Sequence, residues 1–333
     1  MTMSTLHPAS HWTKLPDGRA RCELCPVGCV LSEGKTGVCR GKKVIGGELI
    51  AVNYGRTTSL NLDPVEKKPL YHFHPGTQIL SVGPNGCNLK CDFCQNYHIS
   101  QMEAPTEYLT PEELAAEAAK TGSIGVAYTY TEPLIWFEYV LDAARAVRER
   151  GMVNVLVTNG VINPKPLEEL LPWIDAMNLD IKSMNPEFYK RVCKAKLGPV
   201  LETAKMTAQA GVHLEITNLV IPGQNDSDEL FESLTDFVAG LGRFVVLHFS
   251  RYHPAYKRTT PPTPLESLLR AETIARRKMP YVFIGNIHDP GGEDTHCPSC
   301  GKKIIERWGY SVGAINVANG MCDYCHKPTG IIR

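Results

Sequence analysis

The sequence has no long apolar run and no excess of charge of either sign. No stretch approaches the ~20 consecutive apolar residues of a membrane-spanning helix, and residues 1–20 lack the apolar core of a signal peptide. The 35 basic side chains equal the 35 acidic ones in number, so the composition does not favour a polyanionic partner such as duplex DNA. We therefore expect a cytoplasmic protein that binds neither membranes nor nucleic acid.

Internal repeats and low-complexity tracts are also absent from the 333 residues, which are enough for one large α/β domain or two ordinary ones. Cysteine, in contrast, is abundant, and eleven of the twelve cysteines fall into three groups. Because the cytosol keeps thiols reduced, this clustering indicates metal sites rather than disulfides. Cys193 stands alone on a basic helical stretch, and we expect it to be a packing residue.

Short apolar runs alternate with helical patterns through the middle of the chain. Six runs rich in Val, Ile and Leu have the length of buried parallel strands, at 78–83, 124–130, 153–158, 176–181, 212–221 and 244–250. A further short strand is expected at 281–286. Helical patterns are found at 110–122, 132–151, 164–171, 199–210, 226–240 and 264–279. In the first of these, Thr110 and Glu113 have the spacing of a capping box.

This alternation predicts an α/β fold with a parallel sheet and right-handed crossovers. Six β/α units are too few for the closed eight-fold barrel, so we expect an open partial (β/α)6 barrel. The cysteine groups at both ends add small metal modules. The expected organisation is a cysteine-rich metal-binding segment at 1–75, the barrel at 76–290 and a zinc-ribbon-like module at 291–333.

The stretch "NGCNLKCDFCQNYHIS" holds three cysteines, Cys87, Cys91 and Cys94, directly after the first predicted strand. The loop at the carboxyl end of such a strand belongs to the functional face of these folds. Three thiolates can hold three irons of a [4Fe–4S] cluster and leave the fourth iron open to a substrate or cofactor. The alternatives are a zinc site completed by His98, or three buried thiols.

The run "GCNLKCDFCQN" resembles the cluster motif of the radical S-adenosylmethionine (SAM) enzymes, which have this spacing and usually an aromatic residue before the last cysteine, here Phe93. The resemblance implies that the amino and carboxylate groups of SAM chelate the open iron. One electron from the cluster then cleaves SAM to a 5′-deoxyadenosyl radical, which abstracts hydrogen from a substrate. A low-potential electron donor of the flavodoxin or ferredoxin type is also implied.

Further along the chain, "YTYTEP" is similar to the family's second-strand motif, commonly Gly-Gly-Glu, which contacts the SAM amino group. The glutamate is kept as Glu132, while Tyr130 and Thr131 stand where the glycines would be. The resemblance implies SAM contacts for Thr131 and Glu132. The alternative for Glu132 is a residue in a first helical turn that complements the helix dipole.

Two more runs, "VTNG" and "NLDIK", look like the "DTNG" and "DLK" runs of pyruvate formate-lyase activating enzyme. They imply that Asn159, Asp180 and Lys182 belong to the SAM site. Val157 stands where that relative has an aspartate, so the cation associated with that aspartate is not carried over. In "RYHP", His253 is either a further SAM contact or a structural histidine.

Over nearly the whole chain, the sequence resembles the radical SAM component of the AmmeMemoRadiSam system. The resemblance rests on runs in the same order, namely "CELCPVGC", "NLDPVEKKPLYHFHPG", "GCNLKCDFCQN", "YTYTEP", "NLDIKSMN" and the final "CPSCG…CDYC". This resemblance implies no particular substrate, because the name refers to genes that occur together and not to a reaction.

The two outer cysteine groups have four thiols each. At the C-terminus, Cys297, Cys300, Cys322 and Cys325 form two C-x2-C knuckles, the pattern of a closed structural zinc site. At the N-terminus, the group consists of Cys22, Cys25, Cys29 and Cys39. Its spacing fits either zinc in a structural role or a second [4Fe–4S] cluster that relays electrons.

Two classes of function compete. The first is a radical SAM enzyme of the oxidoreductase or activase kind. It acts either as an activase of a glycyl-radical enzyme or directly on a small molecule or peptide. The second is a non-catalytic, metal-stapled zinc-ribbon module that binds RNA or a protein partner. The neutral charge and the three-cysteine site favour the enzyme. Mutation of Cys91 separates the two, because the binding module would keep its affinity and the enzyme would lose both cluster and turnover.

Overall fold

The computed structural model describes residues 6–287 and 293–333, and its centre is an eight-stranded sheet of order β15-β14-β13-β12-β11-β10-β8-β7. Seven strands are parallel: β8 (Gln78–Gly83), β10 (Gly125–Tyr128), β11 (Val153–Thr158), β12 (Ala176–Asp180), β13 (His213–Val220), β14 (Val246–Arg251) and β15 (Val282–Gly285). The sheet ends at β15 on one side and at β7 on the other, so it is open. The predicted α/β partial barrel is confirmed, including the strand expected at 281–286.

The eighth strand, β7 (Ser59–Pro64), pairs antiparallel with β8, and the sequence patterns did not predict it. It is an edge strand, half of its six side chains are exposed, and it ends at a proline, which cannot donate to a sheet. It lies in the expected 1–75 segment, so that segment contributes to the central sheet. The division into three parts remains a prediction, and its second boundary, at 290/291, lies outside the described residues.

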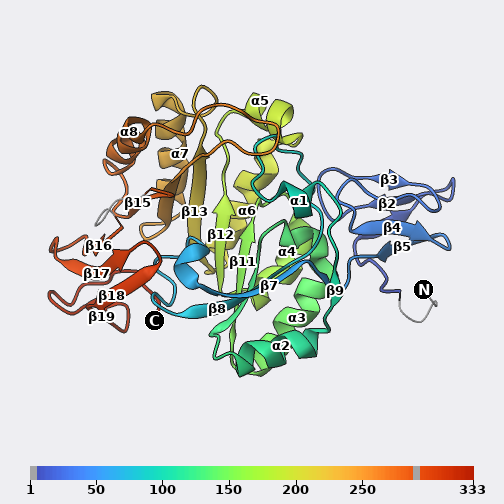
Figure 1. Cartoon of the computed structure of the whole chain (residues 1–333), viewed down its shortest axis with the longest axis horizontal. Helices are drawn as coiled ribbons and strands as arrows, with labels where there is room; N and C mark the ends of the chain where they lie inside the picture. The colour runs from blue at the N-terminus through green and yellow to red at the C-terminus, as the bar shows by residue number, and fades with distance from the viewer. Residues whose placement is uncertain (1–5, 288–292) are drawn as a thin grey trace.

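Helices lie along the outside of the curved sheet (Figure 1). They are α2 (Pro111–Lys120), α3 (Phe137–Glu149), α4 (Pro164–Leu170), α6 (Leu197–Gln209), α7 (Asp228–Leu241) and α8 (Leu265–Ala275). Short elements connect them: η2 (Val65–Lys67), α1 (Tyr97–Ser100), η3 (Pro133–Trp136), η4 (Leu171–Trp173), α5 (Pro186–Phe188), η5 (Tyr189–Cys193), β6 (Arg56–Thr57) and β9 (Glu107–Tyr108). Helix α2 begins with the predicted capping box, in which Thr110 and Glu113 each accept from the other's backbone N–H.

The segment after β7 fills part of the interior of the half-barrel. Val65, Leu70 and Phe73, from the segment after β7, pack against the inner faces of four parallel strands. Their partners are Ile79, Ala127, Val155 and Ala176. Because these partners lie toward the amino ends of their strands or near their middle, space remains near the carboxyl ends.

Two small β structures flank the barrel at opposite ends of the long axis (Figure 1). The N-terminal one contains β1 (Trp12–Lys14), β2 (Ala20–Cys22) and β3 (Val30–Leu31), followed by the hairpin of β4 (Lys42–Ile45) and β5 (Glu48–Ala51). The buried side chain of Lys42 donates to the Glu138 carboxylate on α3 at 2.6 Å. This buried ion pair ties the N-terminal part to the barrel.

The C-terminal ribbon contains β16 (Thr295–His296), β17 (Lys303–Trp308), β18 (Ser311–Ile315), β19 (Val317–Ala318) and β20 (Met321–Cys322). Arg307 on β17 is fully buried. Its guanidinium donates to the hydroxyl of Thr295 at 2.7 Å and to the backbone carbonyls of Glu293 and Tyr71. Arg307 therefore connects the ribbon to the segment that fills the barrel.

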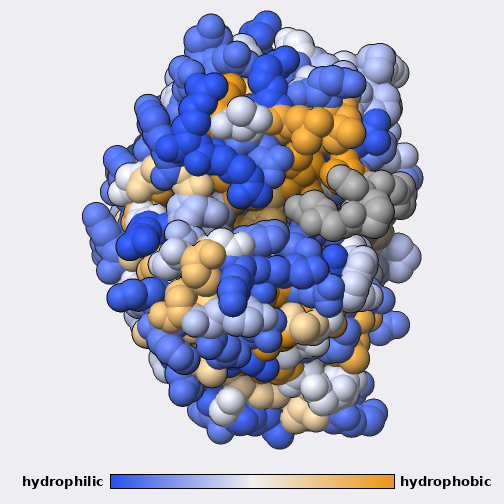
Figure 2. Space-filling model, turned by 90° about the vertical axis from the view of Figure 1, so that its left-hand side faces the viewer, coloured by the Kyte–Doolittle hydropathy of each residue, from blue (hydrophilic) through white to orange (hydrophobic). Residues whose placement is uncertain are grey.

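The surface seen from the ribbon side is mostly hydrophilic, with one apolar area in the upper half of the view (Figure 2). On α8, Leu265 and Leu269 are exposed apolar side chains. Across residues 6–287 and 293–333, no helix has the length and apolar character needed to span a bilayer.

Candidate functional site

The three-cysteine loop begins where β8 ends. Gly86 starts it with a φ of +102°, a conformation that L side chains rarely adopt. Cys91 is buried, and the other two cysteines of the loop are partly buried. The backbone N–H of Leu89 donates to the sulfur of Cys87 at 3.3 Å, and the hydroxyl of Ser100 lies 3.1 Å from the sulfur of Cys94. Such hydrogen bonds to sulfur are among the features that tune iron–sulfur sites.

The spacing of these thiols can be compared with that of the C-terminal ribbon. Among the residues that the structure describes, only the ribbon cysteines bring at least three metal-ligating atoms within 4.8 Å of one another. The three thiols of the loop are therefore spread more widely than ligands around one ion. His98 is exposed and stacks on Tyr97 with ring centroids 3.8 Å apart. This geometry fits a multi-iron cluster better than a zinc site completed by His98.

Cys193 lies at the end of η5 and is completely buried. Its thiol is a hydrogen-bonding neighbour of Cys91, and this contact together with burial raises the pKa of Cys91. Its backbone carbonyl accepts from the N–H of Lys90 at 3.0 Å. The residue expected to serve only in packing thus forms part of the wall behind the three-cysteine loop.

The loop opens into a pocket of about 540 Å³ at the carboxyl ends of the parallel strands. Eight residues identified from the sequence line it: Cys87, Cys91, Phe93, Cys94, Thr131, Asn159, Asp180 and Lys182. Glu132 and His253 do not line it. His253 is exposed outside the pocket, so its assignment as a SAM contact gains no support from the geometry.

Glu132 is fully buried and its carboxylate is saturated with donors. It accepts from the backbone N–H of Leu134 at 3.0 Å, the hydroxyl of Thr158 at 2.6 Å and the backbone N–H of Asn159 at 2.8 Å. Burial raises the pKa of Glu132 to about 7. The contact with Leu134 caps η3, and the other two hold the loop after β11 in place.

Tyr130 occupies a position where relatives commonly have glycine, and its φ of +67° is in the left-handed region. Its hydroxyl donates to Asp63 at 2.6 Å, and its carbonyl accepts from the side chain of Asn96 at 2.5 Å. Asp63 also pairs with Lys67 at 2.8 Å and with Lys68 at 2.6 Å. Although burial opposes ionisation, these three donors hold the pKa of Asp63 well below its usual range. The strained turn is thus secured by a charged network.

On the opposite wall, Lys182 donates to Asp180 at 3.1 Å and lies 6.0 Å from the ring centroid of Phe93. Burial opposes the charge of Lys182, but nearby Asp180 and Cys91 raise its pKa above the ordinary value. The side-chain amide of Asn159 donates toward the sulfur of Cys87 at 3.5 Å. These contacts bring predicted residues from the loops after β8 and β11 and from the end of β12 together around one space.

Several residues of the pocket were not predicted. Their polar members include Lys67, Lys68, Asn96, Thr217, Ser250, Asn286 and Tyr310. Thr217 and Ser250 lie on predicted strands near their carboxyl ends, a position that could have identified them. Tyr310 follows β17 of the ribbon, and only the packing of the ribbon against the barrel brings it here.

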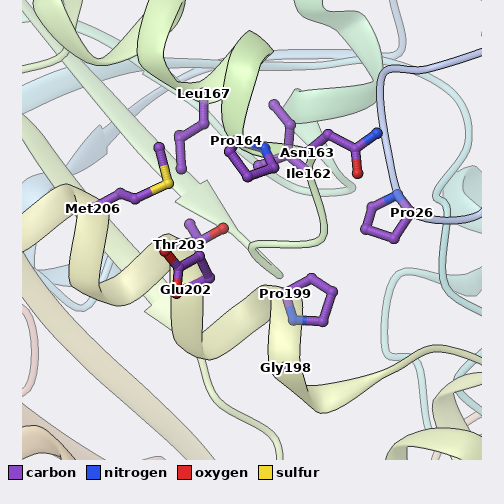
Figure 3. A pocket seen from close by; sticks show the side chains of 10 residues that line it. All are labelled: Pro26, Ile162, Asn163, Pro164, Leu167, Gly198, Pro199, Glu202, Thr203 and Met206. Atoms are coloured by element: carbon purple, nitrogen blue, oxygen red, sulfur yellow. The ribbon is translucent and has the colours of Figure 1, made fainter.

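A second cavity, of about 230 Å³, lies between α4, α6 and the turn that carries Pro26 (Figure 3). Its walls are mostly apolar, and Glu202 is the one ionisable side chain among the described residues that line it. Its described lining has none of the cysteines, lysines and tyrosines that line the larger pocket. We therefore do not assign chemistry to it.

The ribbon thiols form a compact group. The sulfurs of Cys297 and Cys325 are 3.6 Å apart, and those of Cys300 and Cys322 are 3.9 Å apart. Four thiolates bound to a tetrahedral zinc at ~2.3 Å are about 3.8 Å from one another. The ribbon therefore has the geometry of a four-thiolate site for a single metal ion.

Comparison with known proteins identifies the family to which the chain belongs. The Radical SAM superfamily profile matches residues 82–234. The chain is 44% identical to an uncharacterized protein of Methanocaldococcus jannaschii, and the alignment covers 98% of this chain and 100% of that protein. It is 28% identical to the pyruvate formate-lyase 1-activating enzyme of Escherichia coli, over 54% of this chain and 75% of that enzyme. A solved radical SAM methyltransferase from Sphaerobacter thermophilus shares the fold with a TM-score of 0.51 and 16% identity, over 84% of this chain and 76% of that one. The chain belongs to the radical SAM superfamily and is similar to pyruvate formate-lyase activating enzymes.

Proposed function

We propose that this radical SAM enzyme cleaves SAM reductively at a [4Fe–4S] cluster held by Cys87, Cys91 and Cys94. The observation that carries the proposal is the arrangement of the loop: three thiols open on a pocket whose described lining residues include no fourth thiol. The family implies both the cluster and SAM, and the number and spacing of the thiols fit a cluster with one open iron. The bound cluster would supply one electron to the sulfonium, which releases methionine and a 5′-deoxyadenosyl radical.

The pocket residues would position SAM for this step. Asp180 offers a partly exposed carboxylate to the positively charged amino or sulfonium group, and Lys182 donates to that carboxylate at 3.1 Å. Thr131, whose hydroxyl donates to the carbonyl of Pro84 at 2.7 Å, holds the turn after β10 beside the cluster loop. Phe93 and Asn159 complete the wall next to the cysteines.

Glu132 acts in this proposal through other residues. Its three hydrogen bonds hold Thr158 and Asn159 at the edge of the pocket. It is therefore a positioning residue rather than a direct contact to the SAM amino group. His253 lies outside the pocket and keeps only the weaker proposal of a contact made at its rim.

For the substrate, we propose a protein or small molecule that reaches the open side of the pocket. The similarity to pyruvate formate-lyase activating enzymes supports the activase version, with a glycyl-radical enzyme as partner. A low-potential donor of the flavodoxin or ferredoxin type would supply the electron. The alternative, a zinc-ribbon module that binds RNA or protein without catalysis, leaves the three-cysteine pocket without a role.

For the ribbon, we propose a structural zinc ion held by its four thiolates. The site is closed by four protein ligands, and Arg307 holds the ribbon on the barrel. A Cys300→Ser variant, changed at the exposed cysteine of the four, should lose zinc and keep its iron.

Electron paramagnetic resonance (EPR) of anaerobically reconstituted, dithionite-reduced protein tests the cluster and its open position. We expect a [4Fe–4S]⁺ signal that changes when SAM is added, because SAM becomes a ligand of the open iron. The Cys300→Ser variant is the matched control and should behave like wild type. A signal of the three-cysteine cluster that SAM leaves unchanged would contradict the proposal.

A further inference from the structure

The four N-terminal cysteines come together around the small sheet β1-β2-β3. Cys22 ends β2, Cys25 follows in a turn, and Cys29 precedes β3. The N–H of Cys22 donates to the carbonyl of Cys29 at 2.9 Å, which brings the two ends of this turn together. A Cβ atom on Gly37, two residues before Cys39, would lie 3.7 Å from the sulfur of Cys29. The segment that carries Cys39 therefore packs on the turn that carries Cys25 and Cys29.

Their spacing differs from that of the ribbon. All four N-terminal cysteines are described, yet no three of them bring their sulfurs within 4.8 Å of one another, whereas the ribbon thiols do. Thiolates on one zinc ion must be about 3.8 Å apart. A cube of four irons and four sulfides occupies the space between its ligands, so its thiolates are held farther apart. The three-cysteine loop, where the family implies a cluster, also lacks a compact group of the ribbon kind.

The N-terminal group also lies directly against the three-cysteine loop. A Cβ atom on Gly86 would overlap the carbonyl oxygen of Cys39, so the two backbones touch at the residue before Cys87. The Lys90 ammonium donates to the carbonyl of Val38 at 3.1 Å. On the other side, Arg40 donates to the carbonyl of Ser100 at 3.0 Å, and the hydroxyl of Ser100 contacts Cys94.

A second set of contacts joins the N-terminal group to the loop after β11. Next to Cys87, the side chain of Asn88 accepts from Asn159 at 3.0 Å and donates to the carbonyl of Val161 at 2.7 Å. Asn159 also donates toward the sulfur of Cys87 at 3.5 Å. Pro26, which follows Cys25, faces the loop after β11 (Figure 3), and that loop donates from the Asn163 N–H to the carbonyl of Leu24 at 3.0 Å.

We propose that Cys22, Cys25, Cys29 and Cys39 hold a second [4Fe–4S] cluster that relays electrons to the three-cysteine cluster. The relay rests on the proposed function, whereas the presence of the second cluster does not. In each transfer, one electron leaves a reduced flavodoxin or ferredoxin, reduces the N-terminal cluster from 2+ to 1+, and passes to the three-cysteine cluster. No bond forms or breaks in this step.

Metal analysis of the full chain, reconstituted anaerobically with iron and sulfide, tests the second cluster without any activity. We expect about eight irons, eight sulfides and one zinc per chain. About four irons and two zincs per chain would overturn the proposal, because the N-terminal thiols would then bind zinc.

A Cys87→Ala/Cys91→Ala/Cys94→Ala variant separates this proposal from the proposed function. It should keep about four irons and, after reduction, a [4Fe–4S]⁺ EPR signal that does not respond to SAM. Loss of all iron from this folded variant would contradict the N-terminal cluster. If instead the cluster is retained but wild type never responds to SAM, the proposed function fails and the N-terminal cluster stands.

The relay is tested with a Cys29→Ser variant that retains the three-cysteine cluster, as its iron content verifies. We expect 5′-deoxyadenosine formation to fall about tenfold or more with reduced flavodoxin as donor, and to stay near wild type with dithionite, which reaches the pocket directly. Lys302→Met, an exposed ribbon residue that is no metal ligand, is the control and should be unaffected with either donor. An equal rate with flavodoxin, or an equal loss with both donors, would contradict the relay.

Discussion

The carbonyl oxygen of Cys39 occupies the position that a side chain on Gly86 would need. This contact joins the N-terminal cysteine group to the start of the three-cysteine loop, and the φ of +102° at Gly86 permits it. The close approach explains why a glycine stands immediately before Cys87. It also means that the two cysteine groups cannot move independently.

Gly86→Ala should therefore impair both stability and cluster assembly. The added methyl group meets backbone atoms that cannot rotate away, and the residue keeps a φ unfavourable to alanine, so we expect a loss of about 3 kcal/mol in unfolding free energy. Urea unfolding and iron content measure the two effects. Gly122→Ala is the control, since Gly122 has a φ of +68° but open space around it, and it should cost only about 1 kcal/mol and no iron. Equal effects of the two variants would contradict the contact.

Cys91 and Cys193 should differ sharply although their thiols are neighbours. Cys91→Ala should lose the three-cysteine cluster, because two thiolates cannot hold it. Cys193→Ala should keep the cluster and lose about 2 kcal/mol of stability, since a buried side chain is shortened in a packed wall. Iron content and the SAM-dependent EPR signal distinguish the two variants. If the Cys193→Ala variant folds normally but loses its iron, Cys193 is a cluster ligand and this prediction is wrong.

Glu132 should make the stability of the metal-free protein depend on pH. Burial raises its pKa to about 7, so the folded state holds a proton that the unfolded state, with a pKa near 4.5, releases. The contribution of protonated Glu132 to the free energy of unfolding is fully present below about pH 4.5 and is lost as pH rises through about 7. The change is about 3 kcal/mol. Wild type should therefore lose stability relative to Glu132→Gln between pH 5 and pH 8. Urea unfolding of both proteins at the two pH values would contradict this assignment if their difference stays constant.

Arg307 should control the attachment of the ribbon. Arg307→Met leaves the buried carbonyls of Tyr71 and Glu293 without their donor, and we expect a loss of about 3 kcal/mol and faster amide exchange across residues 295–333. Lys302→Met, on the exposed surface of the same ribbon, should change stability by less than about 0.5 kcal/mol. Unchanged exchange in Arg307→Met would show that other contacts suffice.

The parallel strands could be predicted because each is an apolar run buried on both faces, bounded by helix caps or glycines. Strand β7 could not, because its two leucines alternate with polar residues and give no such run, and its pairing depends on β8. The antiparallel pairing of β7 with the edge of β8 depends on tertiary contacts. It leaves little trace in local sequence.

Within the pocket, too, some features could be predicted from the sequence and others could not. Asp180 and Lys182 alternate with apolar neighbours at a strand end, so their shared direction could be predicted. The saturation of Glu132 could not, since its donors Thr158 and Asn159 come from another strand. Tyr310 was missed for a similar reason, because its position depends on how Arg307 docks the ribbon.

Formation of 5′-deoxyadenosine, measured by chromatography after anaerobic reconstitution and incubation with SAM and dithionite, reports the cleavage of SAM directly. Wild type, Cys91→Ala and Cys300→Ser should be compared at matched protein concentration. We expect product from wild type and Cys300→Ser, and none from Cys91→Ala. Product at equal levels from Cys91→Ala, or no product from wild type whose cluster EPR signal already responds to SAM, would contradict the proposed function.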